Sequence, residues 1–321
     1  MATANRPGAR SVPGVKGMLL VVLATACWST SGLFVSFIIA KTGLSALGLA
    51  FWRDLGTFAC LLCGLALVRP RLLRVRQRDL PWLAAMGAIS IGGLHILWNT
   101  GVLVNGVSVS TAFQANSPIF VTVAAWFVWR EPLSGRKIGA IGLALCGTAL
   151  IARLDSLGQA GITPYGLFLG LGVAVSFGAL SLFGKKLAGA YSPWTVLVYI
   201  FGFGALALLP FQGDRTLPPW PLPTAALGSF AGLLLVSTIT GFALYTTSLR
   251  HLQAGVAIIG ATTEVPLAAI AAYLILGERL DARQLLGALL VVGGVVLLSW
   301  PRRATRAPSG STVAERNHPS L

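Results

Sequence analysis

A polar turn that occurs twice in this sequence decides the fold: Arg130-Glu-Pro-Leu-Ser-Gly-Arg-Lys-Ile at residues 130–138 and Gly277-Glu-Arg-Leu-Asp-Ala-Arg-Gln-Leu at residues 277–285. Both copies follow the pattern Glu-x-Leu-x-x-Arg, which pairs Glu131 with Glu278 and Arg136 with Arg283. Each copy lies between two long apolar runs, so each is predicted to join two helices. The simplest interpretation is a tight helical hairpin, capped by Ser134 or Asp281 and held by an ion pair between its Glu and its Arg.

The similarity extends beyond the turns with an offset close to 147 residues. Further matches are Gly17–Trp28 with Gly166–Phe177, Gly147 with Gly294 and, one residue out of step, Gln114–Pro118 with Thr262–Pro266. The chain is therefore predicted to consist of two repeats, residues 17–152 and 165–300. A gene duplication that produced a rigid bundle without a transport role would leave the same pattern, so that alternative stays open.

The composition places most of the protein surface in lipid. Hydrophobic residues make up 55% of the 321 residues, charged residues only 10%, and the mean hydropathy is +0.79. A soluble protein carries about 25% charged residues. The apolar runs are continuous, as in Leu19–Ala26, and lack the alternation of a membrane β-barrel. They predict transmembrane helices, which satisfy their backbone hydrogen bonds within each segment.

Ten runs are long and apolar enough to cross a bilayer, which takes roughly 20 residues. They are 17–40, 45–68, 80–104, 109–129, 136–152, 165–184, 192–212, 225–249, 253–276 and 284–300. The predicted fold class is an all-α membrane protein with ten transmembrane helices. The connections between the runs are too short to hold a soluble domain.

The positive charges indicate the orientation of these helices. The net charge is +15, and the densest group is the five arginines between Arg69 and Arg78. Most Lys and Arg residues fall on one side if the N-tail 1–16 and the C-tail 301–321 are both cytoplasmic. Each repeat holds an odd number of spans, so the second enters the membrane from the opposite side. We therefore predict a multi-pass bacterial-type inner-membrane protein with two inverted five-helix repeats, an arrangement that underlies alternating access.

Three motifs give the repeats a family resemblance. They are Trp28-Ser-Thr-Ser-Gly32, the stretch Phe51-Trp-Arg-Asp54 in the second span, and the two Glu-x-Leu-x-x-Arg turns. With them the chain resembles the EamA-type members of the drug/metabolite transporter superfamily over residues 17–300. The resemblance implies a ten-helix transporter, often an exporter of amino acids or other metabolites, with both ends cytoplasmic. The sequence departs from the family at Ser29, where Gly commonly follows Trp. The second repeat also has Ile200 where the first has Arg53.

Charged side chains inside the membrane are candidates for function, because one at a helix centre costs at least ~2.5 kcal/mol. Glu264 lies mid-way along the ninth predicted span, two residues before Pro266, and matches Asn116, two residues before Pro118. Each proline removes a backbone donor and frees a carbonyl, so polar groups beside it can line a cavity. Glu264 is therefore a candidate for coupling proton movement to transport or for binding a substrate ammonium group. The alternative is a structural, hydrogen-bonded carboxyl group.

Arg53 is the corresponding candidate in the second span. Arginine binds carboxylates through two parallel hydrogen bonds, so Arg53 can anchor a substrate carboxylate. The alternative is a structural contact with Glu264 or with a backbone carbonyl. Asp54 follows directly and points about 100° away on the helix, so it is not expected to pair with Arg53.

Polar and aromatic side chains from four spans complete the predicted pocket. His95 and Asn99 are four residues apart and share a helix face, beside Trp98. The predicted substrate-binding residues are Arg53, His95, Trp98, Asn99, Gln114, Asn116, Tyr245, Thr262 and Glu264. Such a pocket suits an amphipathic or aromatic solute. Ordinary packing for the aromatic residues, and a hydrogen-bonded bundle histidine for His95, are the alternatives.

These features favour a secondary transporter that moves a small metabolite, an amino acid or related solute, with export preferred over uptake. The sequence has no G-x-x-x-x-G-K-[ST] motif, so an ion or solute gradient is the expected energy source, with protons as the candidate ion. The basic charges lie in loops rather than on one face, which argues against a nucleic-acid partner. A lipid-modifying membrane enzyme and a non-transporting scaffold are the alternatives. We expect no catalytic residue, cofactor or metal, and the oligomeric state is left open.

Overall fold

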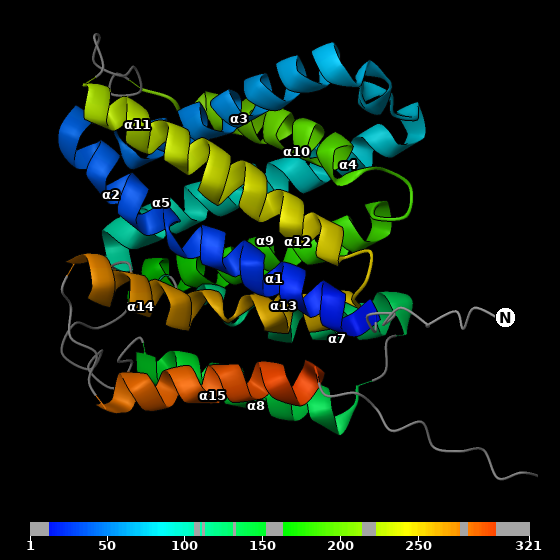
Figure 1. The fold of residues 1–321 in the computed structure, drawn as a ribbon, viewed down its shortest axis with the longest axis vertical. Helices are drawn as coiled ribbons and strands as arrows, with labels where there is room; N and C mark the ends of the chain where they lie inside the picture. The colour runs from blue at the N-terminus through cyan, green and yellow to red at the C-terminus, as the bar shows by residue number, and fades with distance from the viewer. Residues whose placement is uncertain are drawn as a thin grey trace, which may run out of the picture.

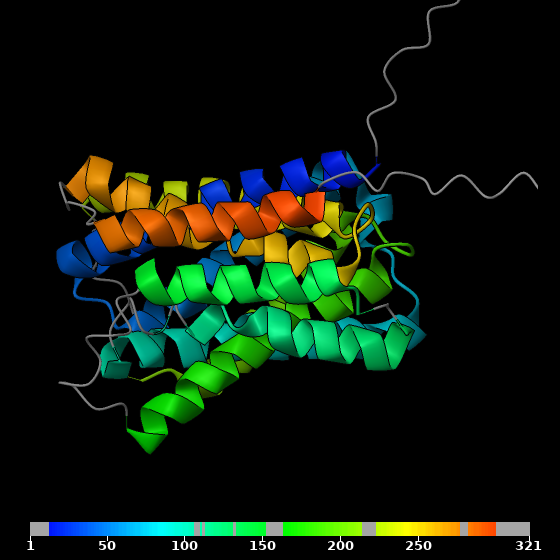
Figure 2. The ribbon, with the colours of Figure 1, turned by 90° about the horizontal axis from the view of Figure 1, so that it is seen from below.

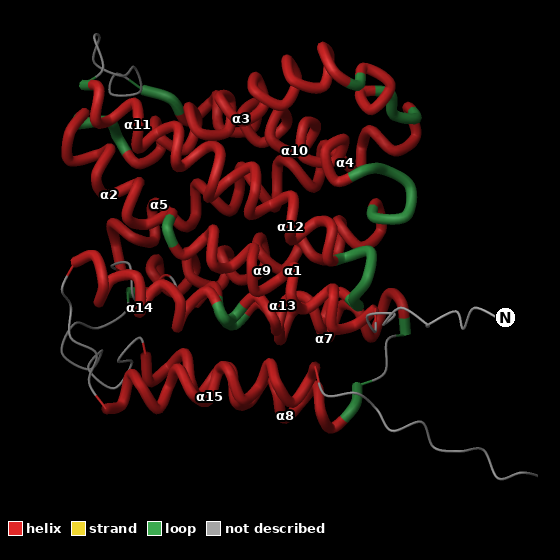
Figure 3. Tube along the Cα trace, viewed as in Figure 1, coloured by secondary structure: helices red, strands yellow, loops and turns green. Residues whose placement is uncertain are grey.

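The computed structural model describes residues 13–105, 110, 113–130, 133–151, 163–213, 223–276 and 282–299. Within these ranges the regular structure is entirely helical, and the helices lie side by side in one bundle (Figure 1; Figure 3). The prediction of an all-α fold is confirmed for this part of the chain.

The described residues of the first half form ten helical elements. They are α1 (Pro13–Ser29), α2 (Ser31–Thr42), α3 (Ala46–Val68), η1 (Pro70–Leu73), η2 (Gln77–Asp79), α4 (Leu80–Gly87) with the π-helical η3 (Ala88–Gly93) and α5 (Leu94–Asn105), and α7 (Ser117–Trp129); α8 (Gly135–Ile151) then closes this half. α4, η3 and α5 follow one another without interruption, and α1 and α2 are separated by a single turn residue, Thr30.

The second half follows the same order. Its elements are α9 (Pro164–Leu187), α10 (Pro193–Leu208), η5 (Leu209–Phe211), α11 (Thr224–Gly232) with the π-helical η6 (Leu233–Thr240) and α12 (Gly241–Ser248), α13 (Ala254–Ala261), α14 (Glu264–Leu276) and α15 (Ala282–Ser299).

Six helical segments in the described residues are long and apolar enough to cross a bilayer. They are Gly14–Thr42, Ala46–Val68, Gln77–Gly101, Pro164–Leu187, Pro193–Phe211 and Thr224–Ser248. Shorter apolar helices occupy Ser117–Trp129, Ala254–Ala268 and Leu285–Gly294. The protein is therefore a multi-span membrane protein by length and composition, and the count of ten spans stays a prediction.

Irregularities in the helices recur at matching places in the two halves. The π-helical segments η3 and η6 interrupt the equivalent long helices, and a turn at 115–116 before α7 matches a turn at 262–263 before α14. The second turn is stabilised by hydroxyl groups: Thr263 Oγ1 donates to the carbonyl of Gly260 and lies 2.8 Å from Thr25 Oγ1 of α1. Structurally, Asn116 therefore corresponds to Thr263. The sequence match of Asn116 with Glu264 is one residue out, because α14 begins at Glu264 itself.

The two halves also contact each other reciprocally at α8 and α15, which lie side by side and run in opposite directions (Figures 1 and 2). A Cβ at Gly147 would lie 2.5 Å from the carbonyl oxygen of Gly287, and a Cβ at the repeat-matched Gly294 would lie 3.0 Å from that of Ala140. Only glycine permits such close backbone approach. Gly147 approaches Gly287, and their repeat-matched residues, Gly294 and Ala140, approach each other in the same way. Two elements related by a two-fold axis make reciprocal contacts of this kind.

An aromatic cluster fills the centre of the bundle and joins the halves. The ring of Trp28 in α1 lies 5.8 Å from Phe177 of α9, 5.1 Å from Phe242 and 5.1 Å from Tyr245, both of α12. Tyr245 is completely buried, and its hydroxyl lies 2.5 Å from Ser181 Oγ. The contacts of Trp28 with Phe177 and Phe242 are edge-on, and such contacts add to the free energy gained by burial.

Basic connections gather at one end of the bundle, at the right in Figure 1. The arginine-rich connection between α3 and α4 is held against α10 by Thr195 and Tyr199, whose hydroxyls donate to the carbonyls of Leu72 and Leu73. Tyr191 donates to Asp79 at 2.6 Å. Partial burial and this hydrogen bond raise the pKa of Tyr191, so the phenol remains a donor at neutral pH.

The α12–α13 connection joins the same end. Lys185 Nζ donates to the carbonyls of Leu249 and Leu252, and Arg250 donates to that of Tyr191. The start of α1 and the end of α15 also lie on this side of the bundle in Figure 1. The described basic residues of the predicted cytoplasmic connections therefore lie at the same end of the bundle.

The repeated polar turn is only partly described. Ser134 Oγ accepts a hydrogen bond from the backbone N–H of Lys137 at 3.4 Å, which agrees with the predicted cap at the start of α8. Glu131, Glu278 and Asp281 lie outside the described residues, as do residues 1–12 and 301–321. The predicted ion pairs of Arg136 and Arg283 with these glutamates stay predictions.

Candidate functional site

A cavity of about 140 Å³ opens where the two halves meet. The first half lines it from α1, α2, α3, α5 and the segment before α7, and the second half lines it from α9, α12 and α14. Its lining residues are Trp28, Ser29, Ser31, Gly32, Arg53, Leu94, His95, Trp98, Gln114, Phe177, Phe242, Glu264 and Ala268. For scale, a cavity of ~150 Å³ in another protein accommodates benzene, so this space suits a small solute.

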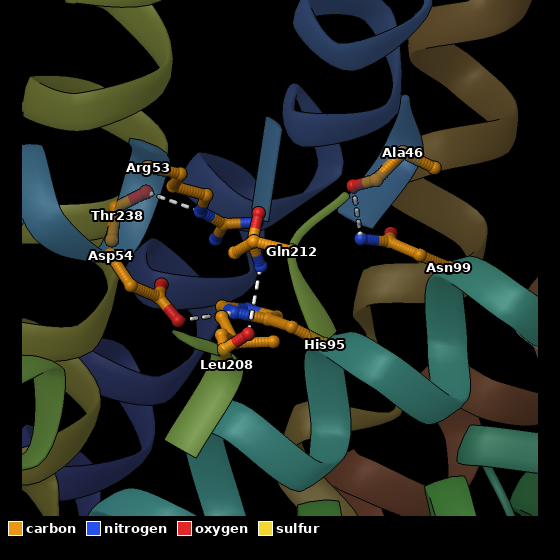
Figure 4. A network of polar contacts seen from close by, with 8 residues as sticks. All are labelled: Ala46, Arg53, Asp54, His95, Asn99, Leu208, Gln212 and Thr238. Atoms are coloured by element: carbon orange, nitrogen blue, oxygen red, sulfur yellow. Dashed lines mark hydrogen bonds and ion pairs between the residues drawn. The ribbon is translucent and has the colours of Figure 1, made fainter. Parts of the chain in front are cut away.

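Arg53 is fixed at the cavity by the second half of the chain. Its Nε donates to Thr238 Oγ1 at 2.8 Å, and Thr238 in turn donates to the carbonyl of Leu233 five residues earlier in η6 (Figure 4). The π-helical geometry of η6 thus positions the acceptor for the guanidinium group. The other N–H groups of Arg53 have no partner among the described residues, which leaves donors for an anionic group in the cavity.

Glu264 lies at the first residue of α14, directly after the turn. Its Oε2 accepts a hydrogen bond from Gln114 Nε2 at 3.2 Å, across the two halves. A carboxylate at a helix N-terminus is favoured by the helix dipole. Arg53 and Glu264 line the same cavity but form no ion pair with each other. The alternative of a structural Arg53–Glu264 contact stays open, because the two charges act on each other without a direct salt bridge.

His95 and Asp54 form a buried pair in the cavity wall. Nδ1 of His95 lies 3.0 Å from Oδ2 of Asp54; His95 is 5% exposed and Asp54 0% (Figure 4). Asp54 therefore pairs with His95 and not with its neighbour Arg53, as the helix geometry predicts. The partner itself was not predicted, because it comes from a different helix.

Five of the nine predicted substrate-binding residues line the cavity: Arg53, His95, Trp98, Gln114 and Glu264. The other four are Asn99, Asn116, Tyr245 and Thr262, and each has a structural setting outside this cavity. Asn99 donates to the carbonyl of Ala46, and Tyr245 is buried against Ser181 and Trp28. Thr262 donates to the carbonyl of Ile259 and borders a neighbouring space of about 10 Å³ beside Glu264. Asn116 occupies the N-cap position of α7.

The sequence prediction missed the part of the lining contributed by the α1–α2 break. Trp28, Ser29, Ser31 and Gly32 all border the cavity, and they belong to the Trp-Ser-Thr-Ser-Gly motif. Small polar residues and a glycine in the middle of an apolar span were the available signal. Phe177 and Phe242 carried none, since a phenylalanine in an apolar helix looks the same whether it faces lipid or a cavity.

The family follows from a comparison with known proteins. A model described as "EamA-like transporter family" matches residues 15–153 and again residues 164–300. The chain belongs to the EamA-like transporter family. The resemblance read from the motifs is thereby confirmed.

Relatives of this EamA-like protein carry transporter names. It is 26% identical to a "Probable terminal-alkyne amino-acid exporter" of Streptantibioticus cattleyicolor, over 94% of this chain and 99% of the relative. It is 26% identical to the "Uncharacterized inner membrane transporter YicL" of Salmonella typhimurium, over 91% of this chain and 98% of the relative. A "Probable amino-acid metabolite efflux pump" of Escherichia coli is 26% identical over 62% of this chain and 70% of the relative.

A solved crystal structure shares the fold of this EamA-like protein. It superposes with a TM-score of 0.73 at 16% identity and covers 88% of this chain and 96% of its own. Together, the family and its relatives indicate a membrane transporter rather than an enzyme, with relatives in the bacterial inner membrane.

Proposed function

We propose that this EamA-like protein is a secondary transporter that exports a small amino acid or a closely related solute. The observation that carries the proposal is that Arg53 and Glu264 border one small cavity without a direct salt bridge between them. A guanidinium group with spare N–H donors and a carboxylate in one cavity match the carboxylate and the ammonium group of a zwitterion.

The aromatic walls supply the third contact. Trp28, Trp98, Phe177 and Phe242 border the same space and offer apolar surface to a solute side chain. Binding of an amino acid in this arrangement would place its charged end between Arg53 and Glu264 and its side chain against the rings. Similarity to relatives named as amino-acid exporters and efflux pumps supports the same class of solute and the outward direction.

Alternating access between two inverted five-helix repeats, residues 17–152 and 165–300, is the mechanism we propose. Three observations support it: the cavity lies between the halves, the irregular segments recur at matching places, and α8 and α15 contact each other reciprocally. In such transporters the halves rock about a site near the middle of the membrane. The basic end of the bundle would face the cytoplasm, together with both tails.

Proton coupling through Glu264 is the proposed energy source. A carboxyl group that faces the cavity and binds the solute ammonium group can hold either a proton or the solute, but not both. Proton entry from outside would then release the solute, and export would follow the inward proton gradient.

Flux into and out of proteoliposomes tests the proposal. The purified protein is reconstituted and supplied with a panel of amino acids and metabolites, with and without an imposed pH gradient. We expect flux of at least one zwitterionic solute, strong loss of flux in Arg53→Gln, and unchanged flux in Gly142→Ala, which faces open space in α8. Absence of flux for every solute under every gradient would overturn the proposed function.

Glu264→Gln separates binding from coupling. We expect this variant to lose most of the acceleration by a pH gradient, because an amide cannot exchange a proton under these conditions. If Glu264→Gln keeps both the rate and the pH dependence of the unaltered protein, Glu264 has no role in coupling.

A further inference from the structure

We propose that Asp54 and His95 form a second proton-binding site of the cavity, in which Nε2 of His95 takes up the proton and Asp54 compensates its charge. The contribution of this pair to transport rests on the proposed function. Its chemistry can be measured on the protein alone.

The geometry fixes which ring nitrogen is free. Asp54 Oδ2 lies 3.0 Å from His95 Nδ1, and the other oxygen, Oδ1, is buried with no hydrogen-bond partner among the described residues. In the proposed site Asp54 is ionised; an ionised carboxylate can only accept, so Nδ1 carries the hydrogen and Nε2 keeps its lone pair. Asp54 holds the imidazole in this tautomer, as a carboxylate commonly does for a functional histidine.

The free nitrogen has access to the cavity. His95 lines the cavity, its Nε2 makes no hydrogen bond to the described residues, and Nε2 is not among the fully buried polar atoms that lack a partner. Figure 4 shows the imidazole beside Asp54, with the Arg53–Thr238 contact next to them. A proton reaching the cavity can therefore reach Nε2 without passing through the protein core.

The charges around the imidazole favour one bound proton. From α3 it is faced by Asp54 and Arg53, and Glu264 of α14 borders the same cavity. With both carboxyl groups ionised and His95 neutral, these groups sum to one negative charge, and a single proton makes the set neutral. Burial penalises an uncompensated charge, so the set has a driving force to bind that proton.

Among the described residues, no other element packed against this region brings a competing charge. η3 has no ionisable residue, and the lysines of α9, Lys185 and Lys186, lie at its far end, where they bind backbone carbonyls and the ring of Trp82. Tyr245 of α12 is occupied by Ser181. The remaining ionisable neighbour on α1, Cys27, is not a cavity residue.

The consequence is a division of tasks within one cavity. Glu264 exchanges its proton for the solute ammonium group, and the imidazole of His95 offers a second place for a proton in the same cavity. Loss of Glu264 alone would then leave some pH response, and loss of both groups would remove it.

Nitrogen NMR of the full-length protein with ¹⁵N-labelled histidine tests the site directly. The chain has three histidines, so His95→Gln assigns the His95 signals and His251→Gln serves as the matched control. We expect the Nδ1–H tautomer at high pH and protonation of Nε2 as the pH falls. Asp54→Asn, which keeps an acceptor oxygen but no charge, should change the pH at which Nε2 takes up its proton, because the compensating charge is lost.

Several outcomes would overturn the inference, whatever the transport assays show. They are an Nε2–H tautomer, an imidazole that does not titrate between about pH 5 and 9, or a midpoint unaffected by Asp54→Asn. If Asp54→Asn does not fold, the tautomer and the titration of the unaltered protein still decide.

Proton counting in proteoliposomes then tests the role in transport. We expect His95→Gln to lower the number of protons moved per solute and to flatten the pH profile, while solute exchange without a gradient persists. An unchanged proton count in His95→Gln would overturn the role in transport. Absence of solute flux in the unaltered protein would instead contradict the proposed function, and would leave the NMR result intact.

Discussion

At the scale of single residues, the cavity is defined by which polar groups are satisfied and which are not. Arg53 uses one donor on Thr238 and presents the rest to the cavity, whereas Tyr245 and Ser181 satisfy each other in the core. Both arginine and tyrosine were singled out by the sequence. Arg53 has N–H donors left for a solute in the cavity, whereas the hydroxyl of Tyr245 is engaged by Ser181.

Arg53 is expected to recognise a carboxylate. Arg53→Gln should weaken amino-acid binding by about 1.5–3 kcal/mol, roughly 10- to 150-fold, because a hydrogen bond to a charged group is lost. Arg53→Lys should recover part of this, since lysine keeps the charge but not the planar fork. Calorimetry with an amino acid and with its decarboxylated amine provides the comparison. Equal losses for both ligands would contradict a carboxylate contact.

The Tyr245–Ser181 contact is expected to contribute to stability. Tyr245→Phe leaves the buried Ser181 hydroxyl without its partner and should cost about 1–3 kcal/mol of unfolding free energy. Adding Ser181→Ala should restore much of the loss, because both polar groups are then absent. Thermal unfolding of the two single variants and the double variant, in detergent, measures the coupling. Strictly additive losses would show that the hydroxyls do not interact.

At the scale of helices, the positions of irregular segments matter more than helix length. η6 carries Thr238, the acceptor for Arg53. η3 ends at Gly93, directly before Leu94 and His95 of α5. π-Helical segments are uncommon and frequently occur at functional sites. Neither was predicted, because an apolar sequence with a 3.6-residue period gives no signal for one extra residue in a turn.

The α8–α15 contact supplies a prediction at this scale. Gly147→Ala and Gly294→Ala should each destabilise the protein, by about 1–3 kcal/mol, because each new methyl group meets a backbone carbonyl of the facing helix. Gly142→Ala and Gly293→Ala lie on the same two helices and meet nothing within 4 Å, so they serve as matched controls. Melting temperatures of all four variants are compared. If the controls melt as early as the contact variants, the close helix contact is not the cause of the destabilisation.

At the scale of the whole molecule, the direction of each half relative to the membrane decides the mechanism. Leu133, before α8, and Ala282, at the start of α15, are exposed residues at matching turns. In a chain freed of Cys27, Cys60, Cys63 and Cys146, Leu133→Cys should react with an impermeant thiol reagent only from the cytoplasm, and Ala282→Cys only from outside. Labelling of both cysteines from the same side would contradict the inverted repeats, and with them the proposed alternating access.

The sequence predicted the architecture more completely than the cavity. The apolar runs, the repeated turn and the charge bias led to an all-helical membrane protein of the EamA-like family. Arg53, His95, Trp98, Gln114 and Glu264 were also found from sequence, since ionisable and polar residues are conspicuous in apolar helices. The pairing of Asp54 with His95 and the lining by Phe177 and Phe242 were not, because they depend on which helices meet.

Hydropathy, repetition and charge are properties of single segments, and lipid imposes the same demand on every span: its backbone must be satisfied internally and its surface must be apolar. The sequence by itself therefore determined that the chain forms membrane helices in two similar sets. Only the tertiary structure decided that Arg53 binds Thr238 rather than Glu264, and that Asn99 and Tyr245 face protein rather than the cavity. Those outcomes depend on how the helices rotate and where they break, which apolar residues specify through packing with distant partners.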